Sequence, residues 1–303
     1  MKLLFLGTSA ARPTAERNVS AMVLTRGGET LLFECGEGTQ RQMMRYGVGF
    51  ALGEVFFTHF HADHFLGIIG LVRTLGLQGR TEPMRLVGPK GARKLLEQAL
   101  ALGVERQPFE VEIVELEPEQ VLAREGYDLK AFRVEHGAGA VGYALIEHLR
   151  LGRFNPERAR ELGVPEGPLW GKLQRGQAVR LDDGREVTPE TIVGAPRPGR
   201  KLVYSGDTRP CAATVEAARG ADLLVHEATF GEEEKDRAKE TAHATAREAA
   251  EVAKQAGVGR LVLTHLSARY SRDAATLLDE ARAVFPETVV AKDGLEIEVP
   301  FAD

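Results

Sequence analysis

The most informative stretch of this chain is a run of metal-binding residue types between Thr58 and His64. It reads Thr-His-Phe-His-Ala-Asp-His, so three of the eight histidines and one carboxylate fall within six positions. The run directly follows the apolar residues 55–57, which are typical of a buried strand. It indicates a metal site rather than a histidine-rich loop, because a full H-x-H-x-D-H pattern after a strand is far more specific than a lone histidine.

The spacing within the run predicts two adjacent metal ions rather than one. Side chains two apart in an extended segment point the same way, so His59 and His61 can bind one ion. We expect a helix to begin near Phe65, which places Asp63 and His64 in its first turn, displaced from the first pair. The second pair then suits a neighbouring ion. The H-E-x-x-H motif is absent, so a helical metalloprotease site is excluded.

Size and composition are those of one large domain or of one domain with an insertion. The chain has 303 residues, of which 43% are hydrophobic and 27% charged, as in ordinary globular proteins. The net charge of −5 argues against wholesale electrostatic binding of nucleic acid but allows a local basic patch. We expect a cytoplasmic protein without membrane contact, because there is no apolar run of roughly 18 residues and no signal-peptide pattern. Cys35 and Cys211 indicate neither a disulfide framework nor a zinc ribbon.

Strands dominate the first half of the chain, and strands alternate with helices in the second half. In the first half we predict strands at residues 2–7, 21–25, 30–34, 84–87, 109–116, 127–134 and 141–146, and helices at 39–44, 65–77 and 92–102. In the second half we predict strands at 201–205, 223–226, 260–264 and within 288–299, and helices at 211–219, 244–255 and 274–285. Two mixed sheets packed face to face with helices outside accommodate this order, which predicts a four-layer αββα sandwich.

Residues 148–199 interrupt this alternation. The segment holds Gly/Pro-rich pieces at 163–173 and 194–199 and the chain's only tryptophan, Trp170. Basic residues recur through it, namely Arg150, Arg153, Arg158, Arg160, Lys172, Arg175 and Arg180. These features favour a solvated loop and a binding arm equally.

Three further candidate ligands each follow a predicted strand, where α/β folds gather their functional groups. They are His136, Asp207 and His265. One carboxylate can offer an oxygen to each of two ions, so Asp207 is predicted to bridge them. The expected sites are His59, His61, His136 and Asp207 for one ion, and Asp63, His64, His265 and Asp207 for the other. Such a pair serves phosphodiester hydrolysis, and ester or thioester hydrolysis almost as well.

These residues resemble the metallo-β-lactamase superfamily and, within it, the ribonuclease Z family of tRNA 3′-processing endonucleases. Other matching pieces are G-T-S at 7–9, R-N-V-S-A at 17–21, E-C-G-E-G-T-Q at 34–40, G-Y at 142–143, S-G-D-T-R-P at 205–210, H-E-A-T-F at 226–230 and T-H-L-S-A-R-Y at 264–270. The resemblance implies a single metallo-β-lactamase domain over residues 1–303. It also implies two Zn²⁺ ions per subunit, with Mn²⁺ or other divalent ions as alternatives, and a homodimer that binds precursor tRNA.

The resemblance implies roles for individual residues as well. Asp63 is expected to be both a metal ligand and the proton acceptor for the attacking water. His243 is expected to stabilise the scissile phosphate or to protonate the leaving 3′ oxygen, with Glu227 orienting its imidazole. Arg269 is a candidate phosphate contact and Arg17 a weaker one, although a surface ion pair would explain either equally well.

The family also carries an arm whose Gly/Pro motif grips the tRNA, and residues 167–173 resemble that motif. This likeness shifts the interpretation of residues 148–199 towards a tRNA-binding arm. Its expected substrate-binding residues are Gly167, Pro168, Gly171 and Lys172. Basic side chains there would contact phosphates, which position a substrate without reading its sequence.

The expected function is a zinc-dependent endoribonuclease that removes the 3′ trailer from precursor tRNA. It would leave a 3′ hydroxyl on the tRNA and a 5′ phosphate on the trailer. The sequence leaves open a 3′ exoribonuclease or a general phosphodiesterase of the same fold. A thioesterase or lactonase fits less well, because those enzymes lack the arm and the His-Glu-Ala-Thr piece. A non-catalytic RNA-binding relic is disfavoured, since relics tend to lose ligands and all seven donors are present.

Overall fold

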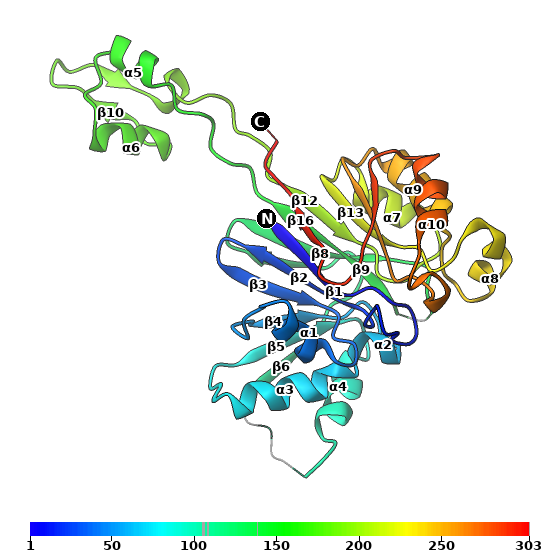
Figure 1. The fold of residues 1–303 in the computed structure, drawn as a ribbon. Coiled ribbons are helices and arrows are strands. Elements are labelled where there is room, and N and C mark those ends of the chain that lie inside the picture. The colour runs from blue at the N-terminus through cyan, green and yellow to red at the C-terminus, as the bar shows by residue number, and fades with distance from the viewer. Residues whose placement is uncertain (105–106, 108, 138, 303) are drawn as a thin grey trace. The chain divides into compact units, whose positions relative to one another are not determined.

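The structure is a computed structural model that describes residues 1–104, 107, 109–137 and 139–302 (Figure 1). The chain divides into two compact units. The first, here called the body, comprises Met1–Ile146 and Lys201–Pro300. The second comprises Glu147–Arg200 and Phe301–Asp303, and its main segment covers the predicted insertion with one residue more at each end.

The body contains two seven-stranded mixed sheets. The first sheet has the order β16 (Glu296–Glu298), β1 (Lys2–Gly7), β2 (Ala21–Arg26), β3 (Glu29–Phe33), β4 (Glu54–Phe56), β5 (Met84–Gly88) and β6 (Val111–Glu115). The second has the order β15 (Thr288–Val290), β14 (Leu261–Thr264), β13 (Leu223–Glu227), β12 (Lys201–Tyr204), β9 (Val141–Glu147), β8 (Tyr127–Arg133) and β7 (Val121–Arg124). Strands β3 to β6 run parallel, as do β12 to β15.

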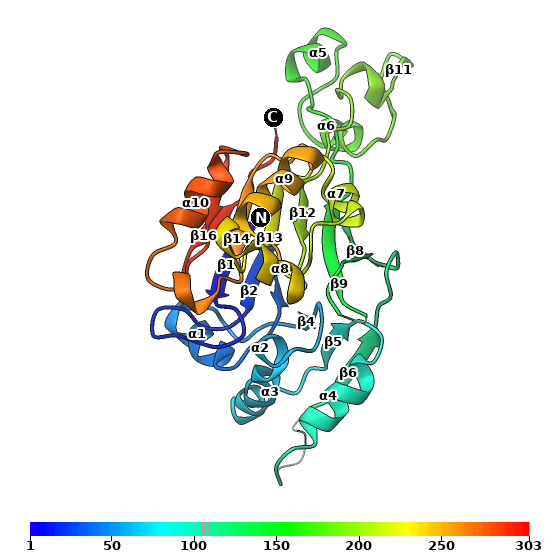
Figure 2. The same cartoon turned by 90° about the vertical axis from the view of Figure 1, so that its right-hand side faces the viewer.

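Helices cover the outer face of each sheet (Figures 1 and 2). Those associated with the first sheet are α1 (Thr39–Arg45), α2 (Ala62–Phe65), α3 (Gly67–Leu77) and α4 (Ala92–Leu100). Those associated with the second are α7 (Ala212–Ala218), α8 (Lys235–Glu240), α9 (Ala246–Ala256) and α10 (Ala275–Arg282). The order helix, sheet, sheet, helix confirms the predicted αββα sandwich.

Alternating side chains of single strands explain the layers. In β1, Leu3 and Phe5 join the apolar core between the two sheets, whereas Leu4 and Leu6 join the core under the helices of the first sheet. A strand covered on both faces is therefore apolar at successive positions. Tyr143 of β9 ties the sheets together, because its hydroxyl donates to the Phe57 carbonyl at 2.7 Å in the middle of the core.

The structure corrects several predicted element boundaries. The helix after the histidine run begins at Ala62 rather than near Phe65, because His61 is the last extended residue, with ψ of 149°. Asp63 then lies in the first turn, where a negative charge is favourable to the helix dipole. Strand β13 extends to Glu227, one residue beyond the prediction. Neither β7 nor α8 was predicted from the sequence, because β7 is only four residues long and α8 consists almost entirely of charged residues.

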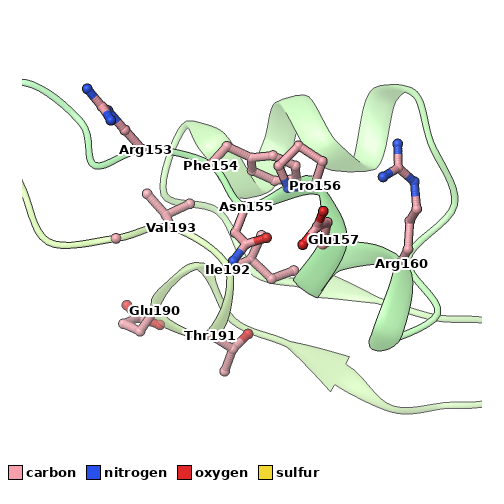
Figure 3. Close-up of a pocket in the computed structure, with 11 residues that line it drawn as sticks. Arg153, Phe154, Asn155, Pro156, Glu157, Arg160, Glu190, Thr191, Ile192 and Val193 are labelled. Carbon is pink, nitrogen blue, oxygen red and sulfur yellow. The ribbon is translucent and has the colours of Figure 1, made fainter.

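The second unit is folded around a small core of its own. It contains α5 (Pro156–Glu161), α6 (Pro168–Gln174) and a hairpin of β10 (Val179–Arg180) with β11 (Glu186–Val187). Trp170 packs against Phe154 with the rings tilted by 42° and their centroids 5.2 Å apart, and its indole N–H donates to the Val164 carbonyl. Glycines and prolines at the ends of these short elements concealed them from sequence analysis. Beside this core lies an open pocket of ≈ 720 Å³ (Figure 3).

Within the second unit, charged side chains hold together the two ends of its main segment. Arg200 makes two side-chain hydrogen bonds to buried Glu147, at 2.7 and 2.8 Å. The guanidinium groups of Arg150 and Arg200 lie 3.7 and 3.8 Å from the ring centroid of Phe301. Across the described part of the chain, none of the helices combines the length and apolarity needed to cross a bilayer.

Candidate metal centre

Seven predicted ligands converge at one edge of the body. They come from the loop after β4 and from α2 (His59, His61, Asp63, His64), and from the segments after β8, β12 and β14 (His136, Asp207, His265). Their ligand atoms form two groups that could each hold a metal ion, His59 with His61, His136 and Asp207, and Asp63 with His64 and His265. The ends of separate strands thus bring together residues that lie up to 206 positions apart in sequence.

Asp207 lies between the two groups. Its Oδ2 atom is 3.3 Å from Nε2 of both His64 and His265, and 3.6 Å from Nε2 of His59. Its Oδ1 atom is buried and has no hydrogen-bond partner among the described residues. A buried carboxylate oxygen without a partner is costly unless it binds a cation. The sharp turn at Gly206, with φ of +60°, delivers this carboxylate.

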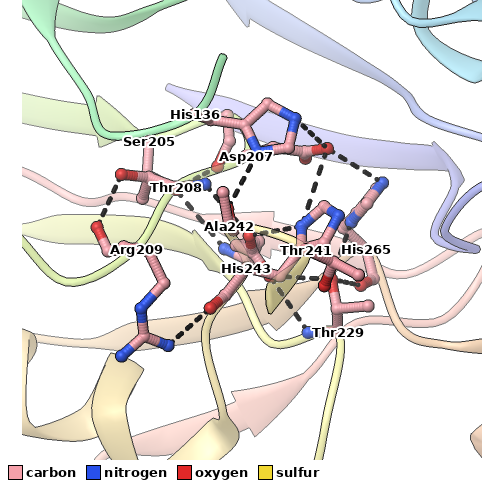
Figure 4. A network of polar contacts seen from close by, with 12 residues as sticks. His136, Ser205, Asp207, Thr208, Arg209, Thr229, Thr241, Ala242, His243 and His265 are labelled. Carbon is pink, nitrogen blue, oxygen red and sulfur yellow. Dashed lines mark hydrogen bonds and ion pairs between the residues drawn. The ribbon is translucent and has the colours of Figure 1, made fainter. Parts of the chain in front are cut away.

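Outer hydrogen bonds set the orientation of three of the imidazoles, of which His136 and His265 can be followed in Figure 4. Nδ1 of His136 lies 2.8 Å from the Ala242 carbonyl, which only accepts, so Nδ1 carries the proton. Nδ1 of His265 lies 3.0 Å from the Thr229 hydroxyl, whose own proton goes to Glu227 at 2.7 Å. Nδ1 of His59 likewise lies 3.0 Å from a hydroxyl, that of Thr58. Each ring therefore turns the Nε2 lone pair inward.

The imidazole nitrogens that face the centre of the site lie too close to one another for neutral rings without a bound cation. Nδ1 of His61 lies 3.0 Å from Nε2 of His59 and 3.2 Å from Nε2 of His136. A proton on His61 could bridge only one of these contacts and would leave two lone pairs facing each other. Burial also lowers the pKa of His59 well below its ordinary value, which keeps that ring neutral. The donor set thus fits divalent metal ions bound by nitrogen and oxygen.

Asp63 is a charged acceptor at the open side of the site. Burial raises its pKa, but the contacts of its Oδ2 atom with the His265 and His64 imidazoles, at 3.3 and 3.5 Å, outweigh burial and hold the pKa well below its ordinary range. Its Oδ2 atom also accepts from the Ala11 backbone N–H at 2.7 Å. Ala11 has φ of 60°, an uncommon value for a residue with a side chain. The loop after β1 is thus built to contact this carboxylate.

His243 and Glu227, the predicted catalytic pair, are in contact. Nδ1 of His243 lies 2.8 Å from Oε1 of Glu227 and 4.0 Å from Oδ2 of Asp207. Burial lowers the pKa of His243, but Glu227 outweighs burial and raises it to about 9. Glu227 is itself fixed, since the backbone N–H groups of Thr208 and Thr229 donate to its two oxygens. The imidazole is therefore oriented at the edge of the ligand cluster.

The backbone of His243 is held as firmly as its side chain. Arg209 donates to the His243 carbonyl at 2.6 Å and binds Glu248 through two hydrogen bonds of 2.6 and 2.7 Å. Glu248 in turn forms a capping box with Thr245 at the start of α9. The end of β12 and the start of α9 thus fix the position of His243 jointly.

Sequence analysis overlooked Glu34, a buried carboxylate behind the ligands. Its Oε1 atom accepts from the Thr58 hydroxyl at 2.5 Å and lies 3.4 Å from Nδ1 of His64. The only sequence signal was its place in the E-C-G-E-G-T-Q piece, to which we assigned no role. Through these contacts Glu34 orients both His64 and the threonine that binds His59.

Replacement of Glu34 by glutamine is expected to weaken metal binding by about 10- to 100-fold, because such outer partners orient the ligands and raise their basicity. Competition between the protein and a zinc-buffering chelator measures this affinity. Glu37→Gln, an exposed neighbour in the same piece, is the matched control and should retain full affinity. Equal affinities of the two variants would contradict the assigned role of Glu34.

A pocket of ≈ 300 Å³ opens onto the centre. Its lining includes His61, Asp63, Asp207, His243, His265, Thr229, Phe230 and two arginines that the sequence analysis did not select, Arg12 and Arg237. Arg269 is absent from this lining and forms an ion pair with Glu234. Arg17 is buried and donates to the Thr8 hydroxyl and the Ala291 carbonyl, so its guanidinium is engaged within the fold.

The remaining predicted substrate-binding residues belong to the second unit. Gly167 precedes α6 with φ of 127°, and Pro168 begins the helix. Gly171 and Lys172 lie within the same helix. The Gly/Pro motif thus forms a short helix of the second unit, and its contact with a substrate stays a prediction.

Comparison with known proteins places this geometry in a family. Residues 1–151 match the family model of the anti-Pycsar protein Apyc1, and residues 173–266 match that of the beta-lactamase superfamily domain. The ribonuclease Z of Gemmatimonas aurantiaca is 60% identical over 301 residues, which cover 99% of this chain and 96% of that protein. The ribonuclease Z of Myxococcus xanthus is 59% identical over 304 residues, covering 100% and 99%.

A solved structure agrees with these relatives. The crystal structure of human tRNase Z, short form, superposes with a TM-score of 0.73 at 29% identity, covering 99% of this chain and 100% of that one. The resemblance drawn from the sequence motifs is confirmed over the whole chain. This chain therefore belongs to the ribonuclease Z family, on the metallo-β-lactamase fold.

Proposed function

We propose that this protein is an endoribonuclease that removes the 3′ trailer from precursor tRNA. The observation that carries the proposal is the combination of a complete two-group ligand cluster with an oriented His243–Glu227 pair in one pocket. Relatives named ribonuclease Z at 59 and 60% identity over the full chain support the substrate class. The products are a tRNA with a 3′ hydroxyl and a trailer with a 5′ phosphate.

We propose zinc as the bound metal, two ions per subunit, with Asp207 as the bridging ligand. Imidazoles and carboxylates in small groups suit Zn²⁺, although Mn²⁺ accepts similar donors. When bound, such a metal pair lowers the pKa of a water and stabilises negative charge on a phosphate. His59, His61, His136, Asp63, His64 and His265 would complete the ligand set.

The residues of the chain supply the proton transfers. Asp63 accepts the proton of the attacking water, because it is ionised and lies at the open side of the site. His243 lies at the other end of the ligand cluster, where Glu227 favours its protonated form. It can donate to the 3′ oxygen as that oxygen leaves. Attack of the water on phosphorus and departure of the 3′ oxygen then give the stated products.

The proposal is tested with the metal-loaded protein on a precursor tRNA that carries a labelled 3′ trailer. A small chromogenic phosphodiester and a thioester are run beside it. Release of one intact trailer, cut directly after the discriminator nucleotide, is the expected result. Stepwise release of nucleotides would show a 3′ exoribonuclease instead. Thioester turnover with inert RNA would refute the assignment.

We propose that the second unit is the arm that binds the body of the tRNA. Ten basic and eight acidic side chains lie between residues 147 and 200, although the whole chain carries a net charge of −5. Several of its arginines pair locally, as Arg158 does with Glu161. Lys172 of α6 and Arg175 at its end have no ion-pair partner among the described residues. They are the cations of this unit best suited to phosphates.

Replacement of residues 150–195 by a short Gly-Ser linker is expected to reduce kcat/KM for precursor tRNA by at least ~10²-fold, because the phosphate contacts of the arm are lost. The flanking chains still pair, since the Glu147 N–H donates to the Arg200 carbonyl at 2.9 Å. Hydrolysis of the small phosphodiester should stay within about twofold, since the pocket belongs to the body. Equal loss on both substrates would contradict the role of the arm.

Homodimerisation and a cytoplasmic location are proposed from family membership alone. Sedimentation velocity across a hundredfold range of concentration tests the dimer. A monomer at all concentrations would contradict it.

A further inference from the structure

Two arginines reach the pocket from separate elements of the body. Arg12 lies in the loop after β1 and Arg237 on α8, and both side chains are exposed. We propose that they position the substrate by binding the phosphates on either side of the scissile bond. Arg237 takes the phosphate on the tRNA side and Arg12 the phosphate on the trailer side. The inference rests on the proposed function and adds the placement of the RNA strand.

Arg237 lies at the end of the pocket that holds His243. Its guanidinium carbon is 5.6 Å from the ring centroid of Phe230, and that ring is 6.2 Å from the ring of His243. Its ion pair with Glu234 is long, at 3.9 Å, and Glu234 also binds Arg269 and the Tyr270 hydroxyl. A pair of this length, with an exposed arginine and a carboxylate shared with another arginine, contributes little. Arg237 therefore keeps guanidinium donors for a phosphate.

The backbone couples Arg237 to the catalytic histidine. The Arg237 carbonyl accepts from both the N–H and the hydroxyl of Thr241, at 3.0 and 2.8 Å, which ends α8. Two residues later the His243 N–H donates to the Ala238 carbonyl at 2.8 Å. These hydrogen bonds in the turn that ends α8 thus fix the backbone positions of Arg237 and His243 relative to each other.

Arg12 lies at the end of the pocket that holds Asp63. The preceding residue, Ala11, donates its N–H to Asp63 at 2.7 Å. The Arg12 carbonyl accepts from the Ser9 hydroxyl at 2.8 Å, which holds the loop in place. Within the described part of the chain, no carboxylate lies at ion-pair distance from the Arg12 guanidinium. An unpaired cation beside a phosphodiester site is suited to bind phosphate.

The chemistry of the cleavage assigns the two arginines to opposite sides. The water oxygen forms a bond to phosphorus while the bond from phosphorus to the 3′ oxygen breaks. One water proton goes to Asp63, and the 3′ oxygen leaves with its electron pair and takes a proton from His243. Attack and departure occur roughly in line. The 3′ oxygen belongs to the tRNA, so the tRNA strand lies at the Arg237 end. The trailer stays attached to phosphorus through an equatorial oxygen, and Arg12, the other arginine of the pocket lining, is the cation that can receive its next phosphate.

Trailer length tests this assignment. Arg12→Ala and Arg237→Ala are assayed on two precursor tRNAs, one with a long trailer and one whose single trailer nucleotide ends in a 3′ hydroxyl. The short substrate has no phosphate beyond the scissile one. We expect Arg237→Ala to lower kcat/KM by about tenfold on both, and Arg12→Ala to do so on the long trailer alone. On the long-trailer substrate, each variant should also reduce the slope of log kcat/KM against log salt concentration by about one.

Two exposed cations outside the pocket serve as controls. Lys239→Ala removes a positive charge from α8, and Arg272→Ala removes one that pairs with Glu16. Both should stay within about twofold of the wild type, and lysine at position 237 should restore part of the loss. The inference would be overturned if Arg12→Ala and Arg237→Ala behaved like the control variants, or if the effect of Arg12→Ala did not depend on trailer length. Neither result would contradict the proposed removal of the trailer. A wild-type enzyme that leaves precursor tRNA intact would overturn the proposed function itself.

Discussion

Replacement of Asp63 by alanine will lower kcat for cleavage of precursor tRNA by at least ~10³-fold, measured with metal-loaded enzyme at saturating substrate. Asp63 accepts a proton in the proposed reaction, and loss of such a group typically costs 10²- to 10⁴-fold. The alanine variant also removes an oxygen from the group with His64 and His265. The two losses act on the same step, so the effect lies in the upper part of that range.

A second variant separates the two losses. Asp63→Asn keeps one oxygen that can act as a ligand but loses the negative charge that accepts the proton. We expect bound metal close to the wild-type amount, determined by elemental analysis, together with a kcat reduced by about 10²-fold or more. An asparagine variant with full metal content and a kcat within tenfold of the wild type would show that another group accepts the proton.

Replacement of His243 by alanine is the second large effect, a fall in kcat of about 10²- to 10³-fold on precursor tRNA. If His243 protonates the leaving 3′ oxygen, a chromogenic diester whose leaving group needs no proton should lose far less activity. Equal losses on the two substrates would show instead that the imidazole stabilises the phosphate. The comparison thus decides between the two roles that the sequence left open.

The pH profile of a Glu227 variant gives an independent readout of the same pair. Glu227 raises the pKa of His243 through its charge and a hydrogen bond of 2.8 Å. Glu227→Gln removes the charge, so the pKa of His243 falls and the protonated form is lost at lower pH. The alkaline limb of the kcat profile should therefore move to lower pH than in the wild type. An unmoved limb would mean that the limb reports another group.

Several features of this protein follow from short stretches of sequence. The H-x-H-x-D-H run predicted four candidate ligands, because the periodicity of a strand and that of a helix both act within its six positions. Strand-end positions then identified His136, Asp207 and His265, since parallel strands deliver their ends to a common edge. The order of strands and helices was sufficient for the αββα sandwich.

Other features depend on contacts between distant segments. Sequence could not reveal that Glu34 lies behind His64. It also left open whether Arg269 contacts a phosphate or forms an ion pair, and could not name Glu234 as its partner. Local composition also misled, since Gly/Pro signals hid α5 and α6 and the charged residues of α8 hid the helix that carries Arg237.

The difference between features predicted from the sequence and features seen only in the structure has a physical cause. Backbone periodicity and metal-ligand chemistry act over a few neighbouring residues, so the sequence by itself determined the layers of the fold and the set of candidate ligands. The protonated nitrogen of each imidazole, the acceptor that holds it and the arginines that face the pocket depend on which segments meet after folding. Hydrogen bonds and ion pairs at 2.5 to 4 Å are decided by that packing, and only the tertiary structure fixed them.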